Sequence, residues 1–212
     1  MTASPPKAIL LDIEGTTTSI AYVADVLFPY ARERIPSWVP IHREEIAGIL
    51  ADMPPGDPVA ILLGWMDQDA KETALKDIQG RIWREGYEAG ELKGHVYPDT
   101  PEALQRWHAA GIGLYIYSSG SIAAQKLIFG NSEAGDLTPY LSGYFDTTTG
   151  PKREADSYTK IAEALALDPA DILFVSDVPA ETDAAKAAGL QARLIDRDTG
   201  KGDIANFAGV LP

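Results

Sequence analysis

The stretch that decides the fold is Ala8-Ile9-Leu10-Leu11-Asp12-Ile13-Glu14-Gly15-Thr16-Thr17, residues 8–17. Its first four residues are apolar without polar alternation, a pattern typical of a strand buried on both faces of a parallel sheet. Three further apolar runs, each bounded by a turn or helix signal, occupy residues 112–117, 172–175 and 190–195. Helical patterns lie between and after these runs, at residues 101–110, 122–129, 158–166 and 181–188. This alternation predicts a doubly wound, Rossmann-like α/β fold around a parallel sheet.

The interval between the first two predicted strands breaks this alternation. Apolar residues recur there at a spacing of three to four in the segments 22–34, 41–51, 59–69 and 73–92. Prolines such as Pro36 and Pro40 separate these segments, because proline is disfavoured inside a helix. We therefore expect residues 1–18 and 99–212 to form the α/β core, and residues 19–98 to form an inserted all-α helical domain.

Composition narrows the class of protein. The chain has 212 residues, of which 45% are hydrophobic and 23% charged, as in folded globular proteins. Its 18 Lys and Arg against 31 Asp and Glu give a net charge of -13, which makes nucleic acid a poor candidate partner. The absence of cysteine excludes disulfides, thiolate zinc sites and a cysteine nucleophile. The sequence has neither an apolar run of membrane-spanning length nor a signal-peptide pattern, so we expect a cytoplasmic protein with no membrane partner.

Carboxylates follow two of the predicted strands. Asp12 and Glu14 come after the first strand, and Asp177 comes after the strand at residues 172–175. Because the carboxyl ends of adjacent strands in an open α/β sheet meet at the ligand-binding crevice, we expect Asp12 and Asp177 to lie close together. Hard oxygen ligands with open positions for water and phosphate suit magnesium better than zinc or calcium. The alternative is that both aspartates only open turns by accepting hydrogen bonds from backbone N–H groups.

Polar and basic residues follow the other motifs. The second strand leads into Ser118 and Ser119 and then into the helix predicted at residues 122–129. Hydroxyls and backbone N–H groups at a helix N-terminus form an anion site, although serines there also serve as N-caps without any ligand. Lys152 lies on a predicted loop before the helix at residues 158–166. A lysine in such a loop, taken alone, is usually a solvated charge.

The ordered set of these motifs resembles the haloacid dehalogenase (HAD-like) superfamily of phosphohydrolases. That superfamily has an acidic motif after the first strand, Ser-Ser after the second, a lysine before a helix, an acidic motif after a later strand, and a helical cap between the first two motifs. The similarity is closer to its acireductone-forming enolase-phosphatase branch of methionine salvage. It extends over LLDIEGTTTSIAYVADVLFPYARE, QGRIWREGYEAGELKG, YIYSSGSIAAQKLIFG, FDTTTGPKREADSYTKIA and ILFVSDVPAETDAA. The resemblance is essentially full length and implies that residues 19–98 are a cap domain.

The resemblance implies covalent catalysis assisted by a metal ion. Asp12 would be the nucleophile that attacks phosphorus and forms an aspartyl-phosphate, which water then hydrolyses. One magnesium ion per subunit would be held by the carboxylates of Asp12 and Asp177 and by the backbone carbonyl of Glu14. Glu181 is a candidate for contacting these metal ligands without binding the ion itself. Asp183 is expected at the surface.

The implied substrate is a small phosphorylated diketone, 2,3-diketo-5-methylthiopentyl 1-phosphate, which is enolised before its enol phosphate is hydrolysed. Ser118, Ser119 and Lys152 would bind its phosphoryl group. Most phosphatases of the superfamily have Asp at the position of Glu14, whereas Glu is expected in the enolase-phosphatase branch. Glu14 is therefore our candidate for the acid and base steps, with Ser118, Ser119 and Lys152 as alternatives for positioning the enolate.

Other functions remain as alternatives at this point. A phosphomutase uses the same aspartyl-phosphate, but it would usually have Asp at position 14 and a more basic cap than the scattered Arg32, Arg34 and Arg43 provide. A phosphatase of another small phosphorylated metabolite is the second alternative. A haloacid dehalogenase needs no magnesium, so Glu14 and Asp177 argue against it, and a non-enzymatic module would leave the ordered motifs unexplained. A core of this size can be stable alone, so we expect a monomer.

Overall fold

The computed structural model describes residues 5–211, which group into two compact units. One unit holds the residues up to Ile20 together with those from Gly94 onward, and the other is Ala21–Lys93. The first unit contains the sheet, and the second consists of helices and their connections. The role of the helical unit as a cap stays a prediction.

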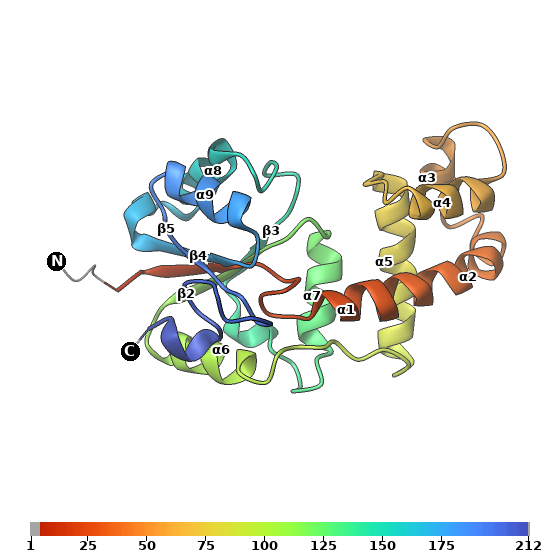
Figure 1. The fold of residues 1–212 in the computed structure, drawn as a ribbon. Helices are drawn as coiled ribbons and strands as arrows, with labels where there is room; N and C mark the ends of the chain where they lie inside the picture. The colour runs from red at the N-terminus through yellow and green to blue at the C-terminus, as the bar shows by residue number, and fades with distance from the viewer. Residues whose placement is uncertain (1–4, 212) are drawn as a thin grey trace. The chain divides into compact units, whose positions relative to one another are not determined.

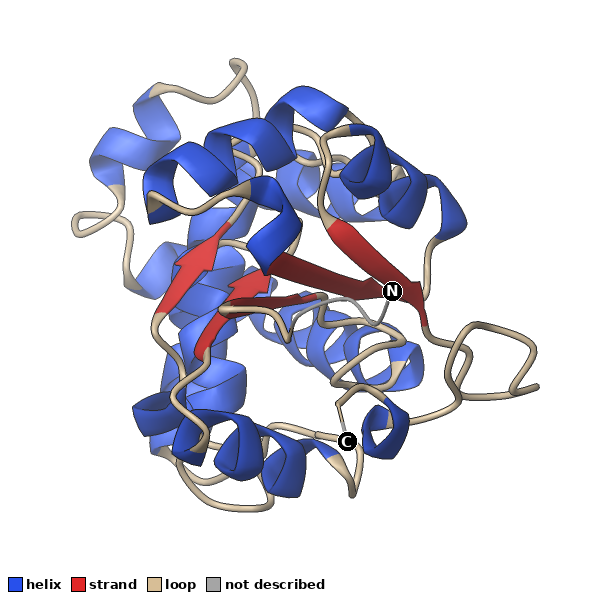
Figure 2. Ribbon diagram, turned by 90° about the vertical axis from the view of Figure 1, so that its left-hand side faces the viewer, coloured by secondary structure: helices blue, strands red, loops and turns tan. Residues whose placement is uncertain are grey.

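A five-stranded parallel sheet forms the centre of the first unit (Figure 1). Its strands are β1 (Ala8–Leu11), β2 (Gly113–Tyr117), β3 (Gly143–Phe145), β4 (Ile172–Ser176) and β5 (Gln191–Leu194), in the order β3-β2-β1-β4-β5. The other elements are α6 (Thr100–Ala109), α7 (Ile122–Gly130), α8 (Ala155–Leu165), α9 (Pro179–Ala187) and the short 3-10 turns η2 (Thr138–Tyr140), η3 (Pro169–Asp171) and η4 (Phe207–Gly209). Figure 2 shows helices on both faces of the sheet, which confirms the predicted doubly wound α/β fold.

Strand β3 is the one element of the sheet that the apolar runs do not predict. It has only three residues, Gly143–Phe145, and all three are partly exposed. It pairs in parallel with β2, with Gly143 opposite Tyr115 and Phe145 opposite Tyr117. A three-residue strand at the edge of a sheet is too short to show a run of buried residues or a clear alternation of apolar and polar residues. Its sequence therefore resembles that of a loop.

The helical unit differs from expectation at its prolines. Its elements are α1 (Ile20–Tyr22), whose first residue belongs to the other unit, the π-helical segment η1 (Val23–Leu27), α2 (Phe28–Ile41), α3 (Ala47–Ala51), α4 (Pro58–Asp67) and α5 (Thr73–Glu88). The expectation that Pro36 and Pro40 separate helices is wrong, because α2 continues through both. Ala31, Ile35 and Trp38 are buried at helical spacing on both sides of Pro36. Burial of this continuous apolar face outweighs the backbone hydrogen bonds that the prolines remove.

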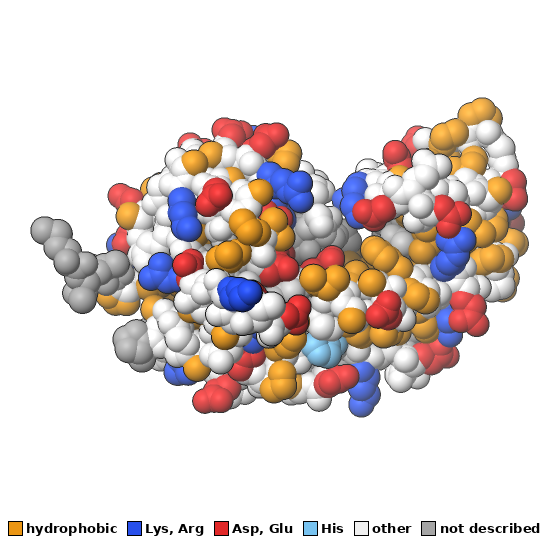
Figure 3. Space-filling model, in the orientation of Figure 1, with side chains coloured by type: hydrophobic (Ala, Val, Ile, Leu, Met, Phe, Trp, Pro, Cys, Tyr) orange, Lys and Arg blue, Asp and Glu red, His pale blue; other side chains and the backbone are white. Residues whose placement is uncertain are grey.

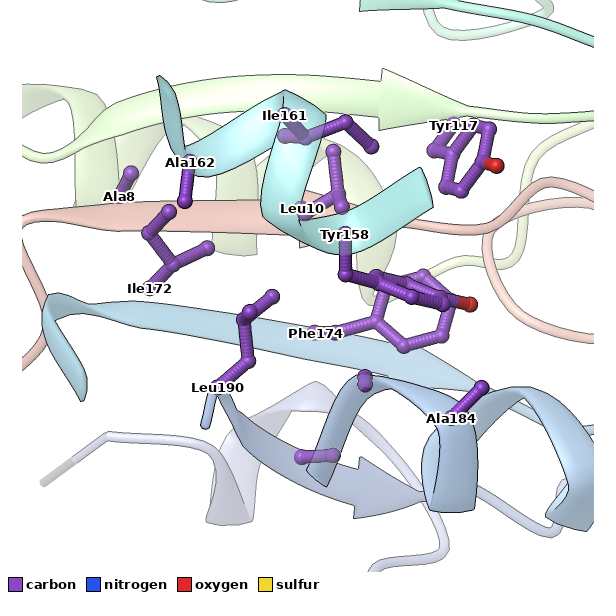
Figure 4. Packing of buried hydrophobic residues seen from close by; sticks show 12 residues of the cluster. Ala8, Leu10, Tyr117, Tyr158, Ile161, Ala162, Ile172, Phe174, Ala184 and Leu190 are labelled. Atoms are coloured by element: carbon purple, nitrogen blue, oxygen red, sulfur yellow. The ribbon is translucent and has the colours of Figure 1, made fainter. Parts of the chain in front are cut away.

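Tyr117, Tyr158 and Phe174 form a buried aromatic cluster in the core of the first unit (Figure 4), and two of their hydroxyls contact the loop at residues 150–152. The ring of Tyr158 on α8 lies 5.1 Å from that of Phe174 on β4 and 5.6 Å from that of Tyr117 at the end of β2. The Tyr117 hydroxyl donates to the Gly150 carbonyl at 2.9 Å, and the Tyr158 hydroxyl donates to the Lys152 carbonyl at 2.6 Å. Core packing therefore fixes the backbone that carries Lys152.

On the face drawn in Figure 3, acidic and basic side chains are interspersed. Across residues 5–211, no helix combines the length and the apolar character needed to cross a membrane.

Candidate active site

The candidate site lies where the strand order reverses. In the parallel register, Leu11 at the end of β1 lies opposite Ile116 of β2 and Val175 of β4. The residues that follow these three strands therefore emerge at the same edge of the sheet. The chain moves outward from β1 to β3 and then returns to β4, which lies beside β1. In doubly wound sheets, ligands bind in the crevice at such a switch point.

Asp12, directly after β1, makes a buried ion pair with Lys152. The Lys152 Nζ lies 2.6 Å from Asp12 Oδ1 and 2.7 Å from Glu181 Oε2. The three side chains expose only 9%, 6% and 10% of their surface, respectively. Asp12 Oδ1 also accepts a hydrogen bond from the Ile13 N–H at 2.7 Å. Lys152 thus bridges two carboxylates from different parts of the chain and is not a solvated loop charge.

Ser176, the last residue of β4, connects the same two carboxylates. Its hydroxyl lies 3.0 Å from both Asp12 Oδ2 and Glu181 Oε2, and its oxygen accepts the Val178 N–H at 3.1 Å. Although burial works to lower the pKa of the Lys152 ammonium, the charges of Asp12 and Glu181 raise it overall. Lys152 therefore stays protonated at neutral pH. Glu181 contacts both Lys152 and Ser176, and its role as a supporting partner of the metal ligands stays a prediction.

Asp177 lies close to Asp12 and to the turn after β1. Burial and, second, the negative charge of Asp12 raise the pKa of Asp177 to about 6. The Asp177 N–H donates to Thr16 Oγ1 at 3.1 Å. Gly15 adopts φ +68°, and a Cβ on this residue would overlap the Asp177 carboxylate. The turn can approach Asp177 this closely because position 15 has no side chain.

We predict that Gly15→Ala disrupts this turn. Alanine at a positive φ is strained, and its methyl group would collide with the Asp177 carboxylate. We expect a lower midpoint in urea unfolding and a loss of the phosphate release that the sequence motifs predict. The matched control is Gly111→Ala, which has φ +77° but meets no atom within 4 Å of its Cβ, so it tests backbone strain alone. Equal activity in the two variants would contradict the importance of the contact with Asp177.

Ser118 and Ser119 lie on the loop that follows β2. Ser118 is buried and Ser119 is exposed. The Ser118 N–H donates to the Phe145 carbonyl at 3.2 Å, and its hydroxyl oxygen accepts the Gly120 N–H at 3.2 Å. The N-cap of α7 is Ser121, whose oxygen accepts the Ala124 N–H. Capping of α7 therefore does not account for Ser118 and Ser119.

The sequence did not single out two residues that support this serine loop. The buried Gln125 donates through Nε2 to the Gly120 carbonyl at 2.8 Å and to the Phe145 carbonyl at 2.9 Å. Asp146, directly after β3, accepts the Ile122 N–H at 3.3 Å. Because β3 itself was not predicted, nothing in the sequence placed Asp146 at a strand end.

Glu14 is an exposed residue on the turn after β1, where it forms an isolated bridge with Thr18. The structure thus joins Asp12, Lys152, Ser176 and Glu181 by direct contacts and places Asp177 beside them. Glu14, Ser118 and Ser119 lie on the loops after β1 and β2. The catalytic, substrate-binding and metal-binding roles of the candidate residues stay predictions.

The donor atoms at the site fit a hard cation. Within residues 5–211, no three His, Asp or Glu side chains form a group that could hold a metal ion, so a metal here would also need backbone carbonyl, phosphate or water ligands. Asp12 Oδ2 accepts one hydrogen bond, from Ser176, and a carboxylate oxygen has two lone-pair positions. Burial and, second, the charge of Asp12 disfavour ionisation of Asp177, and a cation bound by these carboxylates would offset the repulsion between them.

Comparison with known protein families is consistent with this geometry. The model of the haloacid dehalogenase-like hydrolases matches residues 6–189. Enolase-phosphatase E1 of Pseudomonas fluorescens is 52% identical, over 97% of both chains. Enolase-phosphatase E1 of Azotobacter vinelandii is 51% identical, over 98% of both chains.

Solved structures agree with the fold. The crystal structure of the UTR4 protein from Saccharomyces cerevisiae superimposes with a TM-score of 0.81 at 35% identity, and the match covers 90% of each chain. A HAD phosphatase from Thermococcus onnurineus has a TM-score of 0.62 at 21% identity, over 96% of this chain and 95% of that one. The second likeness supports the fold alone.

Proposed function

The chain belongs to the haloacid dehalogenase-like hydrolases and, within them, to the enolase-phosphatases, and we propose that it forms acireductone in methionine salvage. The substrate is 2,3-diketo-5-methylthiopentyl 1-phosphate, which is first enolised and then hydrolysed to acireductone and phosphate. The observation that carries this proposal is the buried Asp12 carboxylate, paired with Lys152 at the switch point of the sheet. A nucleophile beside a fixed cation suits phosphoryl transfer.

Asp12 is the proposed nucleophile. One of its carboxylate oxygens forms a bond to phosphorus while the bond from phosphorus to the ester oxygen breaks, and the departing enol oxygen takes up a proton. Water then attacks phosphorus and gives a proton to a base, and the bond from phosphorus to Asp12 breaks to release phosphate. Lys152 lies 2.6 Å from Oδ1, so it can transfer its hydrogen bond from the carboxylate to a phosphoryl oxygen as the reaction proceeds.

We propose one magnesium ion, held by the Asp12 and Asp177 carboxylates and the Glu14 carbonyl. When bound, it offsets the repulsion between the anionic nucleophile and the anionic phosphate. The residues of the chain provide the rest of the phosphate site. Ser118 and Ser119 donate hydrogen bonds to the phosphoryl group from the loop that Gln125 supports.

Enolisation requires removal of a proton from the carbon between the phosphate ester and the C2 carbonyl, and delivery of a proton to the carbonyl oxygen. Glu14 is our candidate for both transfers. Its carboxylate is exposed on the turn that also carries Asp12, so the acid and base group and the nucleophile share one short segment.

The test is a two-signal assay with purified protein. With magnesium and the diketone phosphate, we expect ultraviolet absorbance from the enol phosphate to rise before inorganic phosphate is released. Treatment with EDTA should remove phosphate release, and added magnesium should restore it. Phosphate release without any preceding enol absorbance would overturn the enolase step, and the absence of phosphate release with magnesium would overturn the whole assignment.

The remaining expectations, a monomer in the cytoplasm with neither nucleic-acid nor membrane partners, stay predictions. Gel filtration with light scattering tests the oligomeric state directly.

A further inference from the structure

An arginine beyond the last strand, whose side chain is largely buried, contacts the turn that follows β1. Arg197 lies outside the stretch that the family model matches, residues 6–189, and its side chain is only 8% exposed. Its Nε and Nη2 atoms donate to the Thr16 carbonyl at 3.0 and 2.6 Å. Its Nη1 atom donates to both carboxylate oxygens of Asp99, at 2.7 and 2.8 Å. One guanidinium group therefore holds two segments that are far apart in sequence.

The surroundings fix the orientation of this guanidinium. Its central carbon lies 4.3 Å from the ring centroid of Tyr97 and 4.5 Å from that of Phe207. Asp99 also accepts the Phe207 N–H at 2.7 Å. A planar fork with five N–H donors can make all these contacts at once, whereas the compact ammonium of lysine cannot.

The residue that Arg197 holds has a direct connection to the active site. Thr16 accepts the Asp177 N–H through Oγ1, and its neighbour Gly15 lies against the Asp177 carboxylate. The carbonyl of Thr16 points to Arg197 while its side chain points to Asp177. A displacement of this carbonyl would move the turn relative to Asp177.

We propose that Arg197 is a positioning residue for the cation site formed by the turn after β1 and Asp177. This inference rests on the proposed function, because it assigns Arg197 to the geometry of that site. Arg197 acts through Thr16 and contacts neither of the two carboxylates, Asp12 and Asp177, that would bind the cation. Its charge is neutralised by Asp99, so its effect is on geometry rather than on the local field.

The direction of the change in cation affinity distinguishes positioning from simple electrostatics. Removal of a positive charge near a cation site strengthens cation binding if charge alone matters. Loss of positioning weakens it, because the carbonyl and carboxylate ligands no longer converge. Supporting contacts of this kind typically contribute about 10–100-fold in metal affinity or activity.

The experiment is a titration of the substrate-free protein with Mn²⁺, followed through the electron paramagnetic resonance signal of the free ion. Arg197→Met keeps an apolar stem between the two rings and removes the guanidinium. We expect its dissociation constant for Mn²⁺ to rise about 10-fold or more, at a temperature where circular dichroism shows a folded protein. The control Arg193→Met, at an exposed position on β5, should bind Mn²⁺ like the wild type. An unchanged or tighter dissociation constant in Arg197→Met would overturn the proposal.

A second variant keeps the test decisive if Arg197→Met does not fold. Arg197→Lys retains the charge and can pair with Asp99, but it cannot also hold the Thr16 carbonyl with two donors. We expect a folded protein with weakened Mn²⁺ binding and a lower kcat at nearly unchanged KM. Wild-type Mn²⁺ affinity in this variant would overturn the proposal. The Mn²⁺ titration needs no substrate, so a wild-type enzyme that fails to turn over the diketone phosphate would refute the proposed function separately.

Discussion

Asp12→Asn is expected to abolish phosphate release while the protein stays folded. The amide that replaces the carboxylate is a poor nucleophile, so kcat for phosphate release should fall at least about 10⁴-fold, as when other covalent nucleophiles are removed. The fold should persist because Lys152 keeps its ion pair with Glu181 at 2.7 Å. Phosphate release and enol absorbance, followed together, measure the two half-reactions. We expect some enolisation to survive, because that step does not use the nucleophile.

A matched variant and a trapping experiment make this result specific. Asp183→Asn changes an exposed carboxylate on α9, two residues after Glu181, and should leave both signals unchanged. Rapid quenching of the wild type during turnover should yield a peptide phosphorylated on Asp12, which Asp12→Asn cannot form. Wild-type rates of phosphate release by Asp12→Asn would refute the covalent mechanism.

The sequence predicted the part of the site that depends on strand ends. Asp12 and Asp177 follow buried apolar runs, and in a parallel sheet such residues emerge at one edge, so their proximity followed from topology alone. The order of the motifs singles out Lys152. The sequence does not predict that Lys152 is buried between two carboxylates, because Glu181 lies 29 positions later, on another element.

The parts that the sequence did not predict depend on tertiary contacts. Strand β3 is too short to show a pattern, and α2 tolerates Pro36 because packing on both sides holds the helix. Arg197 meets Thr16 across 181 positions and Asp99 across 98, and no periodicity or motif signals such a contact. Local patterns reveal which residues face the core, but not which buried charges pair with each other.

Lys152→Met is expected to reduce both stability and catalysis. It removes the ammonium between Asp12 and Glu181 and leaves two buried carboxylates without a cation. Loss of one partner from a buried ion pair costs about 3–5 kcal/mol in the free energy of unfolding, which urea denaturation measures. In the proposed mechanism Lys152 faces the transferring phosphoryl group, so loss of its charge should lower kcat by about 10²–10³-fold. The control Lys160→Met removes an exposed lysine paired with Asp156 on α8 and should change neither quantity.

The two effects of Lys152 can be separated by a second substitution, Glu181→Gln, in the Lys152→Met background. The glutamine amide has nearly the shape of the carboxylate and can still hydrogen-bond with Ser176, but it carries no charge. One of the two unpaired charges is thereby removed, so we expect much of the free energy of unfolding to return. The rate should stay low, because no ammonium is restored opposite the phosphoryl group. If the double variant instead recovered both stability and rate, Lys152 would act only by neutralising Glu181, and its proposed contact with the phosphoryl group would be wrong.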